Sequence, residues 1–327
     1  MLEKLASTWR EFGRVETLNT IDVRGKTLPI YGLVLGPDDK TLPTFGLFAG
    51  VHGLERVGSH VVINFLTPLL EQLRWDKSLQ EIFKQMRLVT IPIVNPGGMF
   101  LNSRSNPNGV DIMRNAPVEA SGEAKPLVSG HRISPMLPWY RGVDGSPMEI
   151  ETQTLVQFIK KEMLDSKFSM ALDVHSGFGM RDRLWYPFSK SADRFPYLNV
   201  VNQFSRLLET IYPHHVYIVE PQHKSYVLHG DPWDFAFDLH EKSRTSSQNI
   251  FVPWCLEMGS WTWLKKNPAQ LFTRHGIFNP ILPHRYSRIM RRHRPLLDLF
   301  RQATSNYLNW LKPDDNVASR EAETRAL

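Results

Sequence analysis

The chain has 327 residues, of which 42% are hydrophobic and 22% are charged, and it contains one cysteine, Cys255. A chain of this length buries about three quarters of the surface that its unfolded form exposes, and a single cysteine cannot form an internal disulfide, so folding requires no oxidising compartment. The formal net charge of +6 permits an anionic partner without implying one.

Charged residues interrupt every apolar stretch near the N-terminus. The segment MLEKLASTWREFGRV lacks the roughly 7 to 15 consecutive apolar residues of a signal sequence. No window of the chain reaches the roughly 18 apolar residues of a membrane span. The sequence therefore predicts a soluble, cytoplasmic protein, with one large domain over residues 1–312 and a polar tail over residues 313–327 that does not pack.

Apolar runs that alternate with segments of helical periodicity indicate the fold class. Runs typical of buried strands lie at 45–51, 88–94, 168–174, 215–219 and 250–256. Segments with helical spacing lie at 56–75, 149–164, 197–212 and 286–311, and Pro295 must kink or split the last one. This alternation predicts an α/β domain with a largely parallel sheet that is covered on both faces.

One long region, 95–148, does not fit the alternation. It is rich in Gly, Pro, Ser and Asn. Loops of this length inside a domain are usually functional or disordered. Because ligands of largely parallel sheets bind at the carboxyl ends of the strands, we expect the functional residues at those ends and in this region.

Histidines follow two of the predicted strands. His52 comes after the first run, with Glu55 three residues later, and His175 ends the run SMALDV. Parallel strands bring their carboxyl ends to one edge, so these residues would form a His, Glu, His set with an open fourth position, the pattern of a catalytic zinc. The alternative for the first pair is a turn histidine beside a glutamate that begins a helix.

Another apolar run, IFVPWCLEMGS, carries Glu257 near its end. A buried carboxylate is costly unless it has a partner or a function. Glu257 is therefore either a general base beside a zinc-bound water or the partner of an arginine. Cys255 is interpreted as a small apolar filler of this strand rather than as a nucleophile.

Two arginines lie in the loop-rich region. Arg104 stands in LNSRSNPNG and Arg114 in GVDIMRN. One could stabilise the oxyanion that develops from a substrate carbonyl, and the other could bind a carboxylate through two parallel hydrogen bonds. Without a metal site nearby they would be ordinary solvated side chains.

Taken together, these stretches resemble the zinc metallocarboxypeptidases of the carboxypeptidase A type. The matching motifs are HGLE, NPGG, the Arg104 loop, NGVDIMRN, LDVHSG and CLEMG, in the family's order from residue 45 to residue 257. The resemblance implies a single domain with a mixed, mostly parallel sheet of about eight strands and one zinc ion per chain. It also implies hydrolysis of a C-terminal or near-terminal amide bond, in peptides or in cell-wall peptide fragments that carry a carboxylate.

The resemblance assigns the metal chemistry to matching residues. His52, Glu55 and His175 would bind zinc, and Glu257 would act as the general base. Asp111 would orient the ring of His52 from the outer shell.

It assigns substrate contacts as well. Arg104 would polarise the substrate carbonyl, Arg114 would bind the terminal carboxylate, and Tyr226 would be the mobile tyrosine that closes over the substrate.

The sequence departs from the family's pattern at three places. Met113 replaces the asparagine that helps Arg114 to hold the carboxylate, which weakens the case for strict carboxypeptidase action. An insertion at 118–148 could cover the cleft. Trp233, beside Asp234, occupies a position that lines the family's side-chain pocket, so we expect a shallow or reshaped pocket there.

Two other functions are compatible with the sequence. An N-acyl amino acid deacylase of the aspartoacylase and succinylglutamate desuccinylase type would also use a His, Glu, His zinc site. That group carries an asparagine where this chain has Met113 and a threonine where it has Ser176, so the chain is closer to the carboxypeptidases. A non-catalytic zinc-binding protein would use the basic segment 285–301 to contact an anionic partner. We interpret that segment as a solvated helix face and expect no nucleic-acid or membrane partner.

Overall fold

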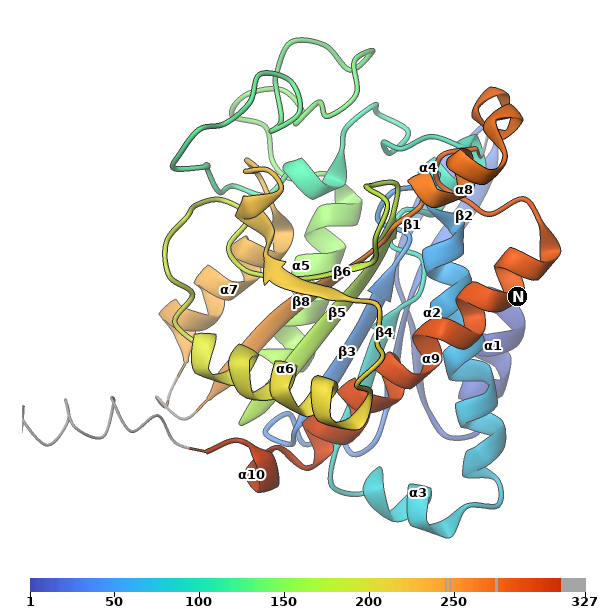
Figure 1. The fold of residues 1–327 in the computed structure, drawn as a ribbon, viewed down its shortest axis with the longest axis vertical. Helices are drawn as coiled ribbons and strands as arrows, with labels where there is room; N and C mark the ends of the chain where they lie inside the picture. The colour runs from blue at the N-terminus through green and yellow to red at the C-terminus, as the bar shows by residue number, and fades with distance from the viewer. Residues whose placement is uncertain (245, 247–248, 274–275, 313–327) are drawn as a thin grey trace, which may run out of the picture.

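The computed structural model describes residues 1–244, 246, 249–273 and 276–312, so the predicted polar tail at 313–327 lies outside the described residues. An eight-stranded sheet, in the order β1-β2-β4-β3-β5-β8-β6-β7, forms the centre of the molecule (Figure 1). Its strands are β1 (Gly13–Val23), β2 (Lys26–Leu35), β3 (Thr44–Ala49), β4 (Arg87–Ile91), β5 (Phe168–Ser176), β6 (Arg183–Tyr186), β7 (Ile218–Pro221) and β8 (Ile250–Met258).

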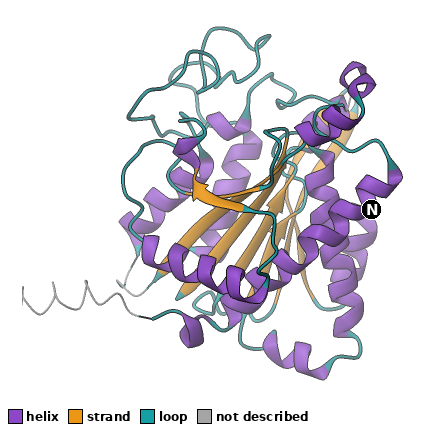
Figure 2. Cartoon of the chain, in the orientation of Figure 1, coloured by secondary structure: helices purple, strands orange, loops and turns teal. Residues whose placement is uncertain are grey.

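Helices surround the sheet, as the purple and orange elements of Figure 2 show. They are α1 (Leu2–Trp9), α2 (Arg56–Leu73), α3 (Lys77–Ile82), α4 (Pro96–Leu101), α5 (Ile150–Met163), α6 (Leu198–Ile211), α7 (Pro232–Ser243), α8 (Trp261–Lys266), α9 (Pro283–Ser305) and α10 (Tyr307–Trp310). Within the described ranges, none of them combines the length and the apolar character needed to cross a membrane.

The four central strands are parallel to one another. β4, β3, β5 and β8 pair side by side in this order, and almost every residue in them is buried. They are the continuous apolar runs that the sequence predicts as buried strands. β2 and β6 flank them in antiparallel pairing, so the sheet is mixed and mostly parallel, as expected.

Helices cover both faces of the sheet, and two side chains of β3 that point to opposite faces contact different helices. The ring of Phe45 stacks on Phe300 of α9, whereas the ring of Phe48 meets Phe158 of α5 and Trp233 of α7. Figure 1 shows the corresponding layers, with α2, α6 and α9 on one side and α5 and α7 on the other. The helical cover on both sides agrees with the predicted architecture.

The β1–β2 hairpin was not predicted. β1 is rich in polar residues and mostly exposed or partly buried, whereas β2 carries an apolar run at 28–35 that was missed. The turn between them places Arg24 at φ 49° and Gly25 at φ 74°. Two consecutive positive φ angles are typical of the tight turns that match the twist of a hairpin.

Two predicted elements differ from the structure. The strand expected at 215–219 is wrong in its first half, since β7 begins at Ile218 and the preceding residues line cavities instead. The long C-terminal helix does not split at Pro295, because α9 continues to Ser305 and the break comes at Asn306. Tyr217 Oη donates a hydrogen bond of 3.3 Å to the carbonyl oxygen of Arg292, in the turn that Pro295 disturbs.

Candidate metal centre

Three metal-ligating side chains meet at the carboxyl edge of the central strands. His52 follows β3, Glu55 is the N-cap residue of α2, and His175 lies near the end of β5. β3 and β5 are adjacent and parallel, with Ala49 opposite Val174, so their ends deliver both histidines to the same place. One ligand atom from each of the three residues lies within 4.8 Å of the others, and all three side chains are buried.

Glu55 lies between the two rings. His52 Nδ1 is 2.8 Å from Glu55 Oε1, and His175 Nδ1 is 3.0 Å from Glu55 Oε2. The backbone N–H of Ser176 donates to Glu55 Oε2 at 3.0 Å, which fixes the carboxylate against the end of β5. The two Nδ1 atoms and the carboxylate therefore converge.

The outer nitrogen of each ring has a buried carboxylate partner. His52 Nε2 lies 3.1 Å from Asp111 Oδ1, where the sequence analysis expects Asp111, and His175 Nε2 lies 2.7 Å from Asp173 Oδ2. Carboxylates in this position hold a ligating histidine in the tautomer that leaves the inner nitrogen free for a metal. Asp173 was missed, although its spacing of two residues from His175 along a strand places both side chains on one side of the sheet.

Trp233 belongs to the same network, and this corrects the prediction made for it. Its indole Nε1 donates a hydrogen bond of 2.8 Å to Asp173 Oδ2. Its ring packs on Phe48 with the centroids 5.1 Å apart, and it does not line the cavity described below. Trp233 thus supports the partner of His175 and does not shape a side-chain pocket.

A glycine makes the turn at His52 possible. A Cβ atom on Gly53 would lie 2.1 Å from the carbonyl carbon of Gly98, so any side chain there would collide with α4. Gly53 N also donates to the carbonyl oxygen of Arg104 at 3.4 Å. The HGLE, NPGG and Arg104 stretches are therefore packed against one another.

The charges of the cluster suit a divalent cation. Burial disfavours the charged form of Glu55, but the two histidines outweigh burial and hold the pKa of Glu55 well below its usual range. Burial also opposes the charge of His175, yet Asp173 and Glu55 raise the pKa of His175 well above its usual value. A metal would take the place of the proton held between these groups, and two imidazole nitrogens with one carboxylate form a typical catalytic zinc set.

Two arginines share Asp111 with His52. Arg104 Nε lies 3.0 Å and Arg114 Nη1 lies 2.8 Å from Asp111 Oδ2. Burial would raise the pKa of Asp111, but the nearby arginines and His52 hold it well below its usual range. Both predicted substrate-binding arginines therefore stand next to the metal ligands, in a fixed ionised cluster.

Glu257 lies opposite His175 in the pairing of β5 with β8. Its Oε1 accepts a hydrogen bond of 3.0 Å from the backbone N–H of Phe178. Burial, followed by the charge of Glu55, raises the pKa of Glu257 to about 8. Within the described residues Glu257 forms no ion pair with an arginine, so the alternative of a structural pair is wrong.

These groups line one cavity of about 450 Å³. The carboxylate of Glu257, the guanidinium groups of Arg104 and Arg114, and the phenol of Tyr226 border it together with the three candidate metal ligands. The ring of Tyr226 contacts Phe178 and Trp185 at centroid distances of 5.4 and 5.6 Å. The structure thus brings every predicted site residue to a single place.

The rim of the cavity includes residues from the insertion. Val128, Pro138 and Trp139 line it, so the segment 118–148, in the loops at the top of Figure 1, borders the cleft as expected. Met113 lines it too, so no amide stands beside Arg114 at that position. Cys255 faces the cavity from β8, and burial raises the pKa of its thiol well above the usual range, which argues against a nucleophile.

Comparison with known proteins places these features in a wider group. A family model described as zinc carboxypeptidase matches residues 15–245, which include the three candidate ligands but end before Glu257. Mouse carboxypeptidase M is 28% identical over 128 residues, which make up 35% of this chain and 28% of the mouse protein. The aligned segment is thus under a third of that relative's length.

Solved structures with a similar fold extend over nearly the whole chain. Thrombin-activatable fibrinolysis inhibitor superposes with a TM-score of 0.66 and 17% identity, over 93% of this chain and 71% of that chain. Carboxypeptidase A from Helicoverpa armigera superposes with a TM-score of 0.62 and 15% identity, over 93% and 71% of the two chains. At these identities the likeness concerns the fold.

Proposed function

The chain belongs to the zinc carboxypeptidase family, and from this premise we propose that it is a zinc-dependent hydrolase that cleaves an amide bond at or near the C-terminus of peptides or peptide-like substrates. One observation supports this most strongly. The two histidine Nδ1 atoms and the carboxylate of Glu55 converge in the same cavity as Glu257 and two arginines.

The position of each polar group in the cleft suits one step of amide hydrolysis. When bound, a zinc ion supplies Lewis acidity that lowers the pKa of a water and polarises a carbonyl. The pKa of Glu257 is raised and its side chain faces the cavity. It can therefore accept the proton of the attacking water and return it to the leaving nitrogen. Arg104 faces the cavity beside Glu55 and can stabilise the oxyanion of the tetrahedral intermediate.

Arg114 is the group best placed to bind a terminal carboxylate. Its Nη1 is occupied by Asp111 and its Nε donates to the carbonyl oxygen of Val128. The second Nη1 hydrogen and both Nη2 hydrogens are then left for the substrate, and Met113 adds no donor beside them. We therefore infer that Arg114 binds the carboxylate without a neighbouring amide, which discriminates less sharply than a guanidinium with a second donor residue beside it.

The aromatic and apolar lining indicates the kind of group that precedes or follows the cleaved bond. Trp139, Phe178, Trp185 and Trp261 surround the polar centre. Such walls bind bulky apolar groups by excluding water. A peptide with an apolar residue beside the scissile bond fits this lining better than a small N-acyl amino acid.

The test combines metal analysis with a substrate panel. Protein purified without added zinc should carry one zinc per chain, and His175→Ala should lose it while keeping its circular dichroism spectrum. The same preparation should hydrolyse N-blocked dipeptides with a free C-terminal carboxylate faster than their C-terminal amides.

N-acetyl amino acids form the comparison arm of the panel. If these are hydrolysed and the peptides are not, the protein is a deacylase and the peptidase proposal is overturned. Folded protein that contains no metal after purification and takes up none on incubation with zinc would overturn the metal site.

A further inference from the structure

A second polar cavity, of about 480 Å³, lies beyond the end of β8. Residues 180–182, residues 258–266 and the first part of α9 contribute to its walls. Met258 and Gly259, which line it, directly follow Glu257 in the chain. The cavity is nevertheless separate from the catalytic cleft, with which it shares no lining residue.

The walls of this cavity carry a large excess of positive charge. Five cationic side chains and one carboxylate line it, which leaves an excess of four positive charges; they are Arg181, Lys266, Arg285, Arg288 and Arg292, against Asp182. Three histidines, His215, His284 and His293, also face it. No other cavity described above has a lining of this kind.

The single carboxylate is already engaged. Asp182 Oδ2 accepts from Arg292 Nη1 at 3.0 Å, and Asp182 Oδ1 accepts from the backbone N–H of Gly259 at 2.9 Å. The other four cations form no ion pair with an acidic side chain in the part of the chain that the structure describes. Like charges brought together without partners repel each other, and a bound anion would relieve this repulsion.

Helix α9 gathers three of these charges on one face. Arg285, Arg288 and Arg292 are spaced by three and four residues, which places them one above another along the helix. The first turn contains no acidic residue and its N-cap residue makes no side-chain cap, so Arg285 stands at the positive end of the helix dipole. This arrangement is unfavourable for the helix alone and favourable for an anion.

The basic segment 285–301 is thus only in part the solvated face that the sequence suggests. Arg291 and Arg294 are exposed and lie outside the cavity, as expected. Arg288 is also exposed, but it lines the cavity together with Arg285 and Arg292, which are partly buried. The difference arises because α8 and residues 180–182 lie opposite this side of α9 and add their own cations.

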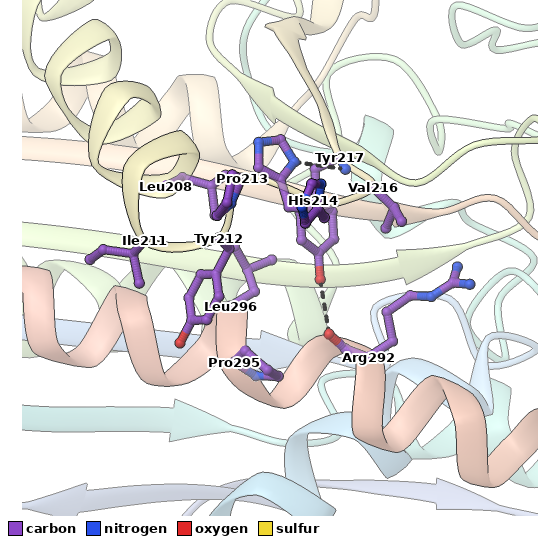
Figure 3. A pocket seen from close by; sticks show the side chains of 11 residues that line it. Leu208, Ile211, Tyr212, Pro213, His214, Val216, Tyr217, Arg292, Pro295 and Leu296 are labelled. Carbon is purple, nitrogen blue, oxygen red and sulfur yellow. Dashed lines mark hydrogen bonds between the residues drawn. The ribbon is translucent and has the colours of Figure 1, made fainter.

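An apolar groove of about 340 Å³ continues from the cationic cavity. The two share His215, Val216 and Arg292 as lining residues. Figure 3 shows Arg292 at one end of the groove and Leu208 and Ile211 at the other. A ligand held at the arginines could therefore extend an apolar part between α6 and α9.

We propose that these two adjoining spaces bind an organic phosphate with more than one negative charge. Its phosphate groups lie among the arginines at the start of α9, and its apolar part lies in the groove of Figure 3. Guanidinium groups and a helix N-terminus are both suited to phosphate oxygens. Because the lining has an excess of four positive charges, a ligand with several negative charges matches it better than a ligand with one carboxylate.

The first experiment measures pyrophosphate binding to the full chain by isothermal titration calorimetry at low ionic strength. Arg285→Glu/Arg288→Glu should raise the Kd at least about tenfold. Arg291→Glu/Arg294→Glu makes the same change in charge on the same helix outside the cavity, and it should alter the Kd less than about twofold. Arg285→Gln/Arg288→Gln gives a milder variant, and thermal unfolding confirms that each protein is folded.

The second experiment tests the groove. Geranyl pyrophosphate should bind at least about tenfold more tightly than pyrophosphate, because its chain leaves water. Ile211→Asp should remove most of this gain, whereas Leu308→Asp, on exposed α10, should not.

Several outcomes overturn the proposal. Absence of saturable pyrophosphate binding, equal weakening by both pairs of arginine substitutions, or a signal that tracks the release of zinc from every variant would exclude the phosphate site. Equal affinity for the two pyrophosphates would exclude the extension into the groove. None of these measurements depends on hydrolysis, so their failure is distinct from failure of the proposed peptidase function.

Discussion

Buried charges gather at both edges of the central sheet, and the two clusters differ in how their charges are matched. At the amino edge, the fully buried carboxylate of Glu162 meets cations from three other segments. It pairs with the buried guanidinium of Arg87, with Lys40 at 2.8 Å, and with Arg14. Arg14 and Lys40 also pair with Glu16 and Asp38. None of these residues lines any of the three cavities described above, so their charges are matched within the protein.

At the carboxyl edge the charges are left open to a cavity. Glu257 has a raised pKa and no cationic partner in the described part of the chain, and Arg104 and Arg114 both face the space beside it. The comparison indicates that a buried charge stabilises the fold where opposite charges in the protein neutralise it. Where a buried charge faces a cavity, it is available to a ligand. The predictions below test this distinction, from the largest expected effect to the smallest.

Substitution of Glu257, which faces the cavity, should lower activity without lowering stability. Glu257→Gln removes the proposed base but keeps the hydrogen bond to Phe178 within reach, so peptide hydrolysis should fall about 10²- to 10⁴-fold while zinc remains bound. The kcat/KM value, zinc content and Tm are measured together. Glu209→Gln, at an exposed position of α6 outside the cleft, serves as the control and should leave all three unchanged. Full activity in Glu257→Gln would refute the assigned role.

Substitution of Glu162, whose charge is paired within the protein, should lower stability without lowering activity. Glu162→Gln leaves the buried guanidinium of Arg87 without its partner, which should lower the free energy of unfolding by about 3–5 kcal/mol. Glu81→Gln breaks an exposed pair with Lys84 and should cost less than about 1 kcal/mol. Urea denaturation measures both, and kcat/KM of the folded protein should stay unchanged. A loss of activity without a loss of stability would contradict the comparison.

The outer shell of the metal site should show an intermediate effect. Trp233→Phe keeps the packing on Phe48 but removes the hydrogen bond to Asp173, so zinc affinity should fall about tenfold in competition with a chelator. Trp254→Phe is the matched control, because the buried Nε1 of Trp254 has no hydrogen-bond partner in the described structure. Equal affinities in the two variants would mean that Trp233 only packs.

A buried histidine outside both clusters makes the stability of the fold depend on pH. His293 lies 3.0 Å from Tyr217 Oη, with Asp182 and Arg292 nearby, and burial lowers its pKa to about 4. Since the folded pKa is below the unfolded one, the neutral ring stabilises the fold at neutral pH. That stability is lost as pH falls from about 6.5 to about 4, by at most about 1.4 kcal/mol per pH unit.

Tm values between pH 7 and pH 4.5 measure this loss. His293→Gln should have a shallower decline than the unsubstituted protein, whereas His284→Gln, which changes an exposed histidine, should not. Parallel curves for all three proteins would show that His293 does not govern the acid response.

The central strands and the convergence of the candidate site residues could be predicted for one physical reason. Each candidate ligand or base stands at the end of an apolar run that is buried on both faces, and parallel strands align their carboxyl ends. His52, His175 and Glu257 all meet this condition. The partly buried hairpin of β1 and β2 does not, and it was missed.

The role of Trp233 could not be predicted, because it depends on distance in space. Sixty residues separate it from Asp173, and only the packing of α7 on the sheet brings the indole to that carboxylate. The cationic cavity has the same origin. Its charges come from three separate segments, and only one of them is a visible basic run in the sequence.

Asp111 has a consequence for how this protein can evolve. Its two carboxylate oxygens contact His52, Arg104 and Arg114, so one side chain constrains a candidate metal ligand and both arginines of the cleft together. A substitution at Asp111 would disturb all three contacts in one step. New substrate preferences can therefore accumulate far more readily in the insertion at 118–148, whose rim residues border the same cleft without touching that carboxylate.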